Sequence, residues 1–209
     1  MSTLEKIAFF QNRRDEVSNQ LLAKELAQTK NSSGIHEIAE NLVNKNKSIR
    51  SDCLKVLYEI GYLNPALIAD YVDDFLKILN NKDNRMVWGA MIALATIADL
   101  RPRDIWAQID DVIRVTEGGT VITLVWGLRA LAKVAAASEN YKDKIFPFLL
   151  AQIRICIPRD VPTHAESALP AVDKQNKVDF LSVLESRRSE LTPAQLTRYK
   201  KVLKRVKEI

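Results

Sequence analysis

Apolar positions along the chain recur with the period of an α-helix. Two neighbouring segments show the pattern, with apolar residues three and four positions apart: Val72, Phe75, Leu76 and Leu79, then Ala90, Ala93, Leu94 and Ile97. Residues at these intervals share one face of a helix, whereas a half-buried strand would alternate every second residue. The pattern therefore predicts pairs of amphipathic helices.

The predicted helix pairs repeat at a nearly constant distance. In the first helix of each pair, one series lies at intervals of 37 residues: Ile35, Val72, Ile109 and Phe146. In the second helix, similar motifs begin at intervals of 37, 37 and 38 residues: Val56, Ala93, Ala130 and Ala168. A small residue stands four places before the Leu of each motif, where close helix approach leaves little room: Cys53, Ala90, Gly127 and Ala165. A repeat of this length predicts an all-α superhelix in which neighbouring pairs share one core.

The register divides the chain into four units and two ends. The expected single domain, 1–209, has repeats at 35–70, 71–107, 108–143 and 144–175. Polar turns at 44–48, 80–84 and 117–120 separate the helices of a unit, and Asn64-Pro65 and Arg101-Pro102 read as breaks between units. One long or two short capping helices are expected over 4–30 within an N-terminal cap, 1–34. Two closing helices are expected over 176–209, the second starting at Thr192-Pro193.

The second helices resemble HEAT repeats. Residues 48–61 follow the pattern Val-Arg-x-x-Ala-x-x-Ala-Leu-x-x-Ile-Gly, and residues 161–169 are a fainter copy. Through 11–17 and 84–91, the whole chain resembles a group of uncharacterised bacterial HEAT-repeat proteins. The resemblance implies a HEAT/armadillo-type solenoid whose second helices line a concave face, and it brings no assigned activity. Val87 and Leu124 depart from the pattern, which has Arg there, and the period is slightly short for the family.

Charge is distributed unevenly along the 209 residues. The net charge is +5, but the segment from Arg187 onward contributes +6 and the rest of the chain −1. Because phosphate contacts dominate affinity for nucleic acids, a near-neutral body disfavours a nucleic-acid binder as the leading interpretation. The basic tail predicts a separate surface on the last helix, composed of Lys200, Lys201, Lys204 and Arg205. It serves either as a solvated outer face of a cap or as a binding site for an anionic partner.

Several features indicate a cytoplasmic protein. The N-terminus lacks the apolar core of a signal peptide, and the apolar stretches 86–98 and 121–137 are too short or too charged to span a membrane. The two cysteines, Cys53 and Cys156, are expected to be free thiols in a reducing compartment.

If the second helices line the concave face, their positions not used for packing form a candidate binding stripe. Six residues are assigned to it: Trp88, Trp126, Lys55, Ile92, Arg129 and Lys133. Aromatic and Arg side chains dominate binding hot spots, so this stripe suits a peptide or protein partner. The alternative is that both tryptophans fill the core between repeats.

One arrangement suggests an enzyme. Trp106 and Asp110 give the aromatic residue and carboxylate that HEAT-like alkylpurine DNA glycosylases use in a basic concave groove. However, Asp110 repeats Asp73 of the preceding unit, which favours a solvated acid in the first turn of a helix.

The remaining reactive residue types form no recognisable site. His36 and His164 lie far from each other and from the cysteines in sequence, so no metal or cofactor is expected. The leading prediction is a non-enzymatic, monomeric cytoplasmic scaffold that binds a protein or peptide. The alternative is a nucleic-acid-binding HEAT-like protein, possibly related to the alkylpurine glycosylases.

Overall fold

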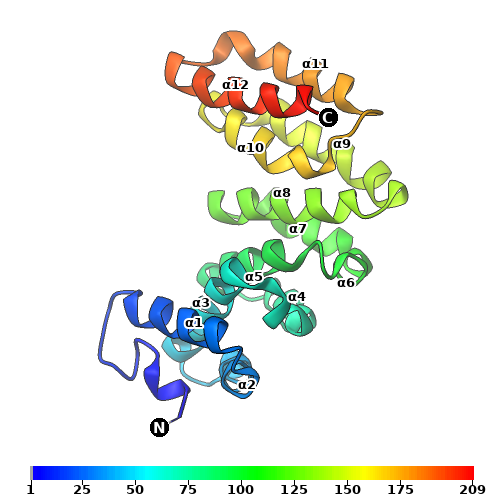
Figure 1. The fold of residues 1–209 in the computed structure, drawn as a ribbon. Coiled ribbons are helices and arrows are strands. Elements are labelled where there is room, and N and C mark those ends of the chain that lie inside the picture. Colours follow the sequence, from blue (N-terminus) through cyan, green and yellow to red (C-terminus); the bar gives the residue numbers. More distant parts are fainter. Residues whose placement is uncertain (1) are drawn as a thin grey trace.

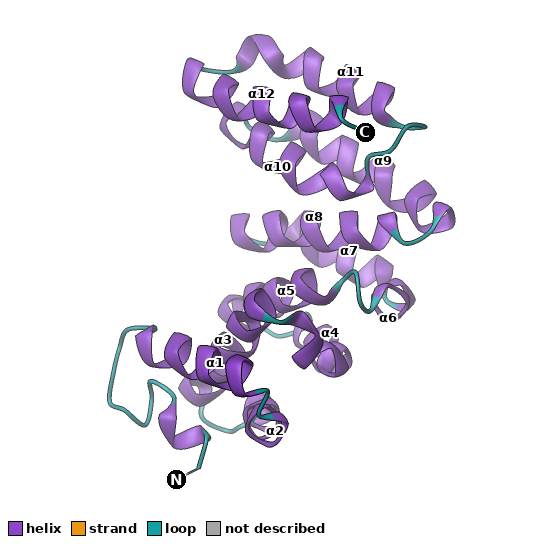
Figure 2. Ribbon diagram, viewed as in Figure 1, coloured by secondary structure: helices purple, strands orange, loops and turns teal. Residues whose placement is uncertain are grey.

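The protein is a stack of helices that runs from one end of the molecule to the other. The computed structural model describes residues 2–209, and all regular secondary structure in that range is helical (Figure 2). The N-terminus and C-terminus lie at opposite ends of the stack (Figure 1). One connected apolar core extends from Ile7 to Val206. The predicted all-α solenoid is confirmed.

The helices form two rows. The inner row contains α1 (Val17–Thr29), α3 (Lys47–Leu63), α5 (Asn84–Ile97), α8 (Val121–Ala136), α10 (Val161–Ala168) and α12 (Pro193–Lys207). Each inner helix packs against the next (Figure 1). The outer row contains α2 (Ser32–Glu40), α4 (Val72–Ile78), α6 (Pro102–Ala107), α7 (Ile109–Gly118), α9 (Glu139–Ile155) and α11 (Lys177–Arg187).

The polar turns predicted between paired helices are where the inner helices start. Asn46, Asp83 and Thr120 are N-caps whose side-chain oxygens accept hydrogen bonds from backbone amides of the first turn. Thr192 caps α12 in the same way, and its partner Gln195 completes a capping box, as Thr192-Pro193 predicted.

The predicted breaks between units are instead the starts of additional short helices. Pro65 begins a 3-10 helix, Pro65–Leu67, and Pro102 begins α6. Proline suits a first helical position because its ring presets φ and its missing N–H would have no partner there. In the fourth unit α9 starts at Glu139, which is 37 residues after Pro102, and continues unbroken for 17 residues. The pairs α4–α5 and α7–α8 are therefore each preceded by short helices, whereas α9 is one continuous outer helix.

The N-terminal cap contains less helix than expected. Of the segment 4–30, only α1 is α-helical, preceded by a short 3-10 turn, Leu4–Lys6. The stretch between them is irregular and passes through a left-handed Asn12 with φ 49°. It is fastened to α3 by Asp52, whose carboxylate accepts from the Phe9 amide at 2.8 Å and from Asn19 Nδ2 at 2.9 Å.

Two polar links attach the C-terminal helices to the last repeat. Arg187 is buried and donates from its Nη atoms to the carbonyls of Ile153 and Cys156, both at 2.8 Å, so it satisfies the open end of α9. It therefore does not contribute to the basic surface, although its sequence position placed it in the basic tail.

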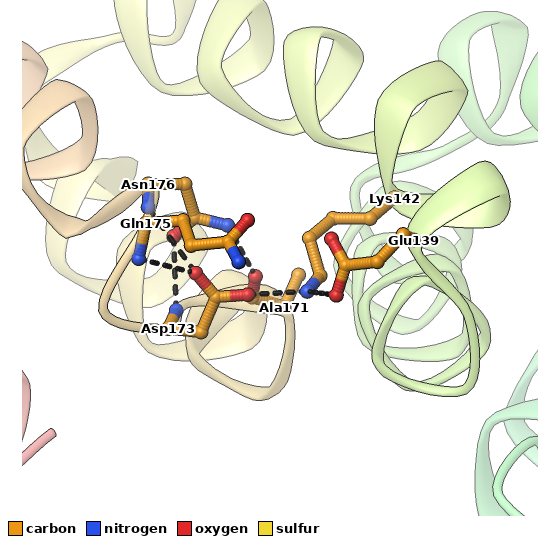
Figure 3. Close-up of polar contacts among 6 residues, drawn as sticks. All are labelled: Glu139, Lys142, Ala171, Asp173, Gln175 and Asn176. Atoms are coloured by element: carbon orange, nitrogen blue, oxygen red, sulfur yellow. Dashed lines mark hydrogen bonds and ion pairs between the residues drawn. The ribbon is translucent and has the colours of Figure 1, made fainter.

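The second link joins α9 to the loop before α11 (Figure 3). Lys142 is paired with both Glu139 and Asp173, and Asp173 also accepts from the amides of Gln175 and Asn176. The hydrogen bond from Lys142 holds the pKa of Asp173 below its ordinary value, and the two carboxylates raise the pKa of Lys142.

The small residues predicted to allow close helix approach occupy the contacts between helices. Cys53, Ala90 and Ala165 are completely buried, and Gly127 of α8 faces Thr116 of α7. A Cβ added at Gly127 would stand 2.8 Å from the Cβ of Thr116, closer than packed carbons approach. The glycine thus sets the distance between α7 and α8.

His164 is also packed inside, on α10. Its side chain is 1% exposed, and its Nδ1 has no hydrogen-bond partner. Burial lowers the pKa of His164, and the backbone of Gln152 and the charge of Asp160 oppose this only in part. The imidazole is therefore neutral in the folded protein near pH 7.

We predict that Gly127→Ala lowers the free energy of unfolding by about 1–3 kcal/mol, the usual cost of overpacking. Gly118→Ala, where nothing lies within 4 Å of the added Cβ, is the matched control and should be neutral or slightly stabilising. Urea denaturation measures both. The Gly127→Ala loss should also shrink in a Thr116→Ala background; equal losses at the two glycines would contradict the packing argument.

We predict that stability falls as the pH drops below about 6.5, the ordinary pKa of unfolded histidine. Because the folded-state pKa of His164 is depressed, the unfolded chain binds more protons in this range, and ∂ΔG/∂pH is positive. The slope for one such group cannot exceed about 1.4 kcal/mol per pH unit. Thermal unfolding across pH 5.5 to 7.5 should lose this slope in His164→Leu and keep it in His36→Gln, since His36 is exposed. A slope unchanged in His164→Leu would refute the assignment.

Candidate binding groove

A groove crosses the inner row of helices. Its volume is about 500 Å³, and residues of α3, α5, α8 and α10 line it together. Tyr62 and Gly61 come from α3, Ala95 and Thr96 from α5, and the others include Trp126, Arg129, Lys133, Glu166 and Ser167. Because one hollow is shared by four successive inner helices, this row forms the concave side of the solenoid.

Aromatic rings lie in a continuous row along this side. Trp88 contacts Tyr58 with ring centroids 6.2 Å apart, Tyr58 contacts Tyr62 at 5.9 Å, and Tyr62 contacts Trp126 at 5.6 Å. Tyr62 belongs to α3 and Trp126 to α8, so their contact passes over α5. Small side chains on α5 leave space for it, since α5 contributes Ala95 and Thr96 to this part of the groove.

The charged groups of the groove differ in how they are paired. Lys133 Nζ lies 3.0 Å from Asp99 Oδ1, and Glu166 accepts from Arg198 Nε of α12 at 3.0 Å. Arg129 stacks on Trp126 with its Cζ 4.4 Å from the ring centroid. Within the described residues, no carboxylate lies within 4.0 Å of Arg129, and its only hydrogen bond is a long one of 3.4 Å from Nε to Ser167.

The structure brings half of the predicted stripe into the groove. Trp126, Arg129 and Lys133 line it, each of them half-buried. Trp88 lies outside the groove, in the joint between α3 and α5, and reaches it only through the tyrosines. Both tryptophans also pack against the core while remaining partly exposed.

Lys55 and Ile92 are not available to a partner, contrary to their assignment to the stripe. Ile92 is 5% exposed and belongs to the core. Lys55 is 7% exposed, and its Nζ lies 2.7 Å from carboxylate oxygens of both Glu16 and Glu59. Although burial alone lowers the pKa of this amine, the two carboxylates raise it above its ordinary value. Lys55 fastens the N-terminal segment to α3.

The sequence prediction missed the tyrosines. Tyr58 and Tyr62 are four positions apart and so share one face of α3. The predicted stripe ended with the row of Glu59, because the repeated motif stops at Gly61, whereas α3 continues to Leu63. An aromatic pair at helical spacing was the available signal.

The residues that suggested a glycosylase lie in the outer row. Trp106 of α6 stacks on Tyr141 of α9 with centroids 4.1 Å apart, and Asp110 of α7 pairs with Lys144 at 2.6 Å. They surround their own hollow of about 500 Å³, which shares no residue with the groove. Asp110 stands in the first turn of its helix, as its repetition predicted.

A hollow of about 560 Å³ at the N-terminal end of the inner row is strongly charged. Four basic and four acidic side chains line it: Arg13, Arg14, Lys47, Arg85, Asp15, Glu16, Asp52 and Asp83. Three of the four bases pair with these acids, Arg13 with Asp15, Lys47 with Asp83 and Arg85 with Glu16. Internal pairs therefore neutralise most of these charges, and Arg14 is the one base of the hollow without a carboxylate within 4.0 Å in the described chain.

Metal-binding clusters and membrane-spanning helices are both absent from residues 2–209. No group of three or more His, Cys, Asp or Glu side chains is placed to hold a metal ion. No helix in the same range has the length and apolarity to cross a membrane. Cys53 and Cys156 are free thiols, and burial raises the pKa of Cys53 to about 12.

The predicted basic tail forms the outer face of α12. Tyr199, Val202 and Val206 face the core, and all four predicted basic residues are exposed: Lys200, Lys201, Lys204 and Arg205. No carboxylate of the described chain lies within 4.0 Å of these four, whereas Arg198 on the same helix is paired with Glu166.

Comparisons with known proteins support the fold. No protein-family profile and no curated protein sequence matches the chain. Among solved structures, an engineered protein is 16% identical, with 100% of this chain and 98% of that chain covered and a TM-score of 0.66. A designed armadillo repeat protein in complex with the peptide (KR)4 is 12% identical, with 98% of each chain covered and a TM-score of 0.66. The karyopherin Kap121p, bound to the SUMO protease Ulp1p, is 14% identical over 99% of this chain and 23% of its own, with a TM-score of 0.67.

These likenesses cover nearly all of this chain and place its fold among the α-solenoids of armadillo/HEAT type. At identities of 12–16%, these similarities show the fold alone.

Proposed function

We propose that the protein is a non-enzymatic scaffold that holds an extended segment of another protein in the groove across α3, α5, α8 and α10. The observation that carries the proposal is the contact between Tyr62 and Trp126 in a groove bordered by Arg129 and Lys133. Tyrosine, tryptophan and arginine supply most of the binding energy in protein interfaces. Here they are concentrated on the concave surface that solenoids use for extended ligands.

The size of the groove suits a short extended segment. Packed helices are about 8–10 Å apart, so four successive inner helices span about 30 Å. An extended chain rises about 3.3 Å per residue, which gives a bound segment of about nine residues. The designed armadillo repeat protein and the karyopherin, each in complex with a partner, offer analogies for this mode of binding.

The setting of this function is part of the proposal. The free thiols Cys53 and Cys156 suit a reducing compartment, and we place the protein in the cytoplasm as a monomer. The resemblance of 11–17 and 84–91 to bacterial HEAT-repeat proteins suggests a bacterial adaptor of that kind. The repeat units are proposed to follow the register 35–70, 71–107, 108–143 and 144–175, between caps at 1–34 and 176–209.

A second candidate function belongs to the outer face of α12. Its four exposed basic side chains have no carboxylate partner within the described chain, so they are available to a polyanion such as a nucleic acid. Arg198, on the same helix, is instead held by Glu166 at the groove.

The groove is tested with a displayed library of random peptides about nine residues long, selected on the wild-type protein. Peptides so obtained should bind Trp126→Ala at least about tenfold more weakly, because removing a hot-spot aromatic costs about 2 kcal/mol or more. Fluorescence anisotropy with the synthetic peptides measures the affinities.

Trp106→Ala is the matched control for this substitution. Trp106 is also half-buried, stacked on a tyrosine and covered by a cation, but it lies in the outer row. It should leave the affinities unchanged. Peptides that bind Trp126→Ala as well as wild type would contradict the proposed function, and circular dichroism verifies that both variants keep their helicity.

For α12, we predict that changing Lys200, Lys201, Lys204 and Arg205 to Gln makes the protein elute from heparin at lower salt, because fewer counterions are released on binding. The control removes four exposed cations elsewhere: Lys24, Lys45, Lys82 and Arg103. Equal shifts in the two variants would show that only net charge matters and would reject a site on α12.

A further inference from the structure

From the charge pairing in the groove we infer that the bound segment is acidic: it carries an Asp or Glu side chain whose carboxylate binds Arg129, next to an apolar side chain that packs on Tyr62 and Trp126. This inference rests on the proposed function and specifies its ligand. What sets this preference is which charged groups of the groove already have partners.

The acids of the groove are all occupied. Asp99 is held by Lys133 at 3.0 Å, and Glu166 by Arg198 at 3.0 Å. Glu59, one turn before Tyr62 on α3, is held by Lys55 at 2.7 Å. A basic peptide would have to displace these internal cations, and the energy gained from one pair would be offset by the loss of another.

Of the two cations that line the groove, Arg129 and Lys133, Arg129 is the one without a carboxylate partner within the described chain. The guanidinium lies over the Trp126 ring, with Cζ 4.4 Å from the centroid, and its contact from Nε to Ser167 is long, 3.4 Å. The Nη donors have no acceptor among the described residues. A guanidinium binds a carboxylate with two parallel hydrogen bonds, and one already held in place loses less side-chain entropy on binding.

The surroundings of Arg129 make an anion more favourable there than in open water. Arg129 is half-buried between α8 and α10, with the Trp126 ring on one side. Reduced exposure to water strengthens a charge-assisted hydrogen bond. Beside it, the rings of Tyr62 and Trp126 form an exposed apolar edge, since Tyr62 is 45% exposed. An acidic residue next to a leucine or an aromatic residue satisfies both features.

This ligand preference is opposite to that of the designed armadillo repeat protein, whose bound peptide is (KR)4. The two proteins share a fold, so the difference resides in the side chains of the concave face. In the present chain the decisive positions are Arg129, which lacks an acid, and the three acids that are already paired.

The test uses the selected peptides about nine residues long, synthesised with amidated C-termini so that side chains alone supply carboxylates. The wild-type protein should select sequences enriched in Asp or Glu and depleted in Lys and Arg. For one such peptide, a single Glu→Gln change should weaken binding about tenfold or more, the effect of losing a charge-assisted hydrogen bond. Arg129→Gln should cause a similar loss with the Glu peptide and little loss with the Gln peptide.

Lys133→Gln is the matched control, because Lys133 is on the same helix and in the same groove but is paired with Asp99. Any loss of affinity that Lys133→Gln causes should be the same for the Glu peptide and the Gln peptide. Peptides that require Trp126 but show no acidic preference, or a basic one, overturn this inference and leave the proposed function standing. A library that yields no Trp126-dependent peptide overturns both. Selected peptides whose Glu→Gln penalty is unchanged in Arg129→Gln also overturn it, because the carboxylate would then bind elsewhere. Thermal midpoints close to wild type verify that Arg129→Gln folds.

Discussion

The close packing of successive inner helices is the constraint on which the rest of the molecule depends. Glycines at the contacts allow this close approach: a Cβ added at Gly61 of α3 would collide with Thr96 Oγ1 of α5, and one added at Gly89 of α5 would stand 2.7 Å from Leu54 Cδ2 of α3. These short distances are repeated along the row. Their sum is what allows Tyr62 and Trp126, which come from helices separated by a third, to meet at 5.6 Å. A looser stack would open the row of aromatic rings into separate side chains and remove the groove.

The charges on the concave side are organised by pairing rather than by number. Lys55, Lys133 and Arg198 each neutralise an acid of their own chain, and their contribution is structural. Arg129 is covered by a ring instead of a carboxylate. The net charge of such a surface says little about its ligand. The relevant quantity is the charge that remains once internal pairs are formed, and this cannot be read from composition.

The sequence predicted the parts of the structure that depend on periodicity. The helical repeat, the small contact positions and the N-cap Thr192 follow from local rules of spacing and hydrogen bonding, and the predicted polar turns contain the N-caps Asn46, Asp83 and Thr120. It predicted the candidate site less well. Lys55 and Ile92 fall on the right face of their helices but are covered by neighbours, and the covering residue Glu16 comes from an irregular segment without a periodic signal. Tyr62 was missed because it lies beyond the end of the repeated motif, and its contact with Trp126, 64 positions away on α8, arises only when the helices pack.

The fourth unit differs from the others in a way that limits how such an array can grow. Its inner helix α10 has 8 residues, whereas α8 has 16, and a 3-10 helix that contains Pro170 follows directly after α10. Its outer helix is continuous and is attached to the closing helices by Arg187 and Lys142. Duplicating this unit would also duplicate contacts that are specific to the C-terminal closing helices. The starts Pro65, Pro102 and Glu139 are spaced evenly at 37 residues, so the segments 65–101 and 102–138 have equal lengths and equivalent starts. A further repeat unit, added by gene duplication or by design to lengthen the groove, would therefore be inserted in the middle of the molecule.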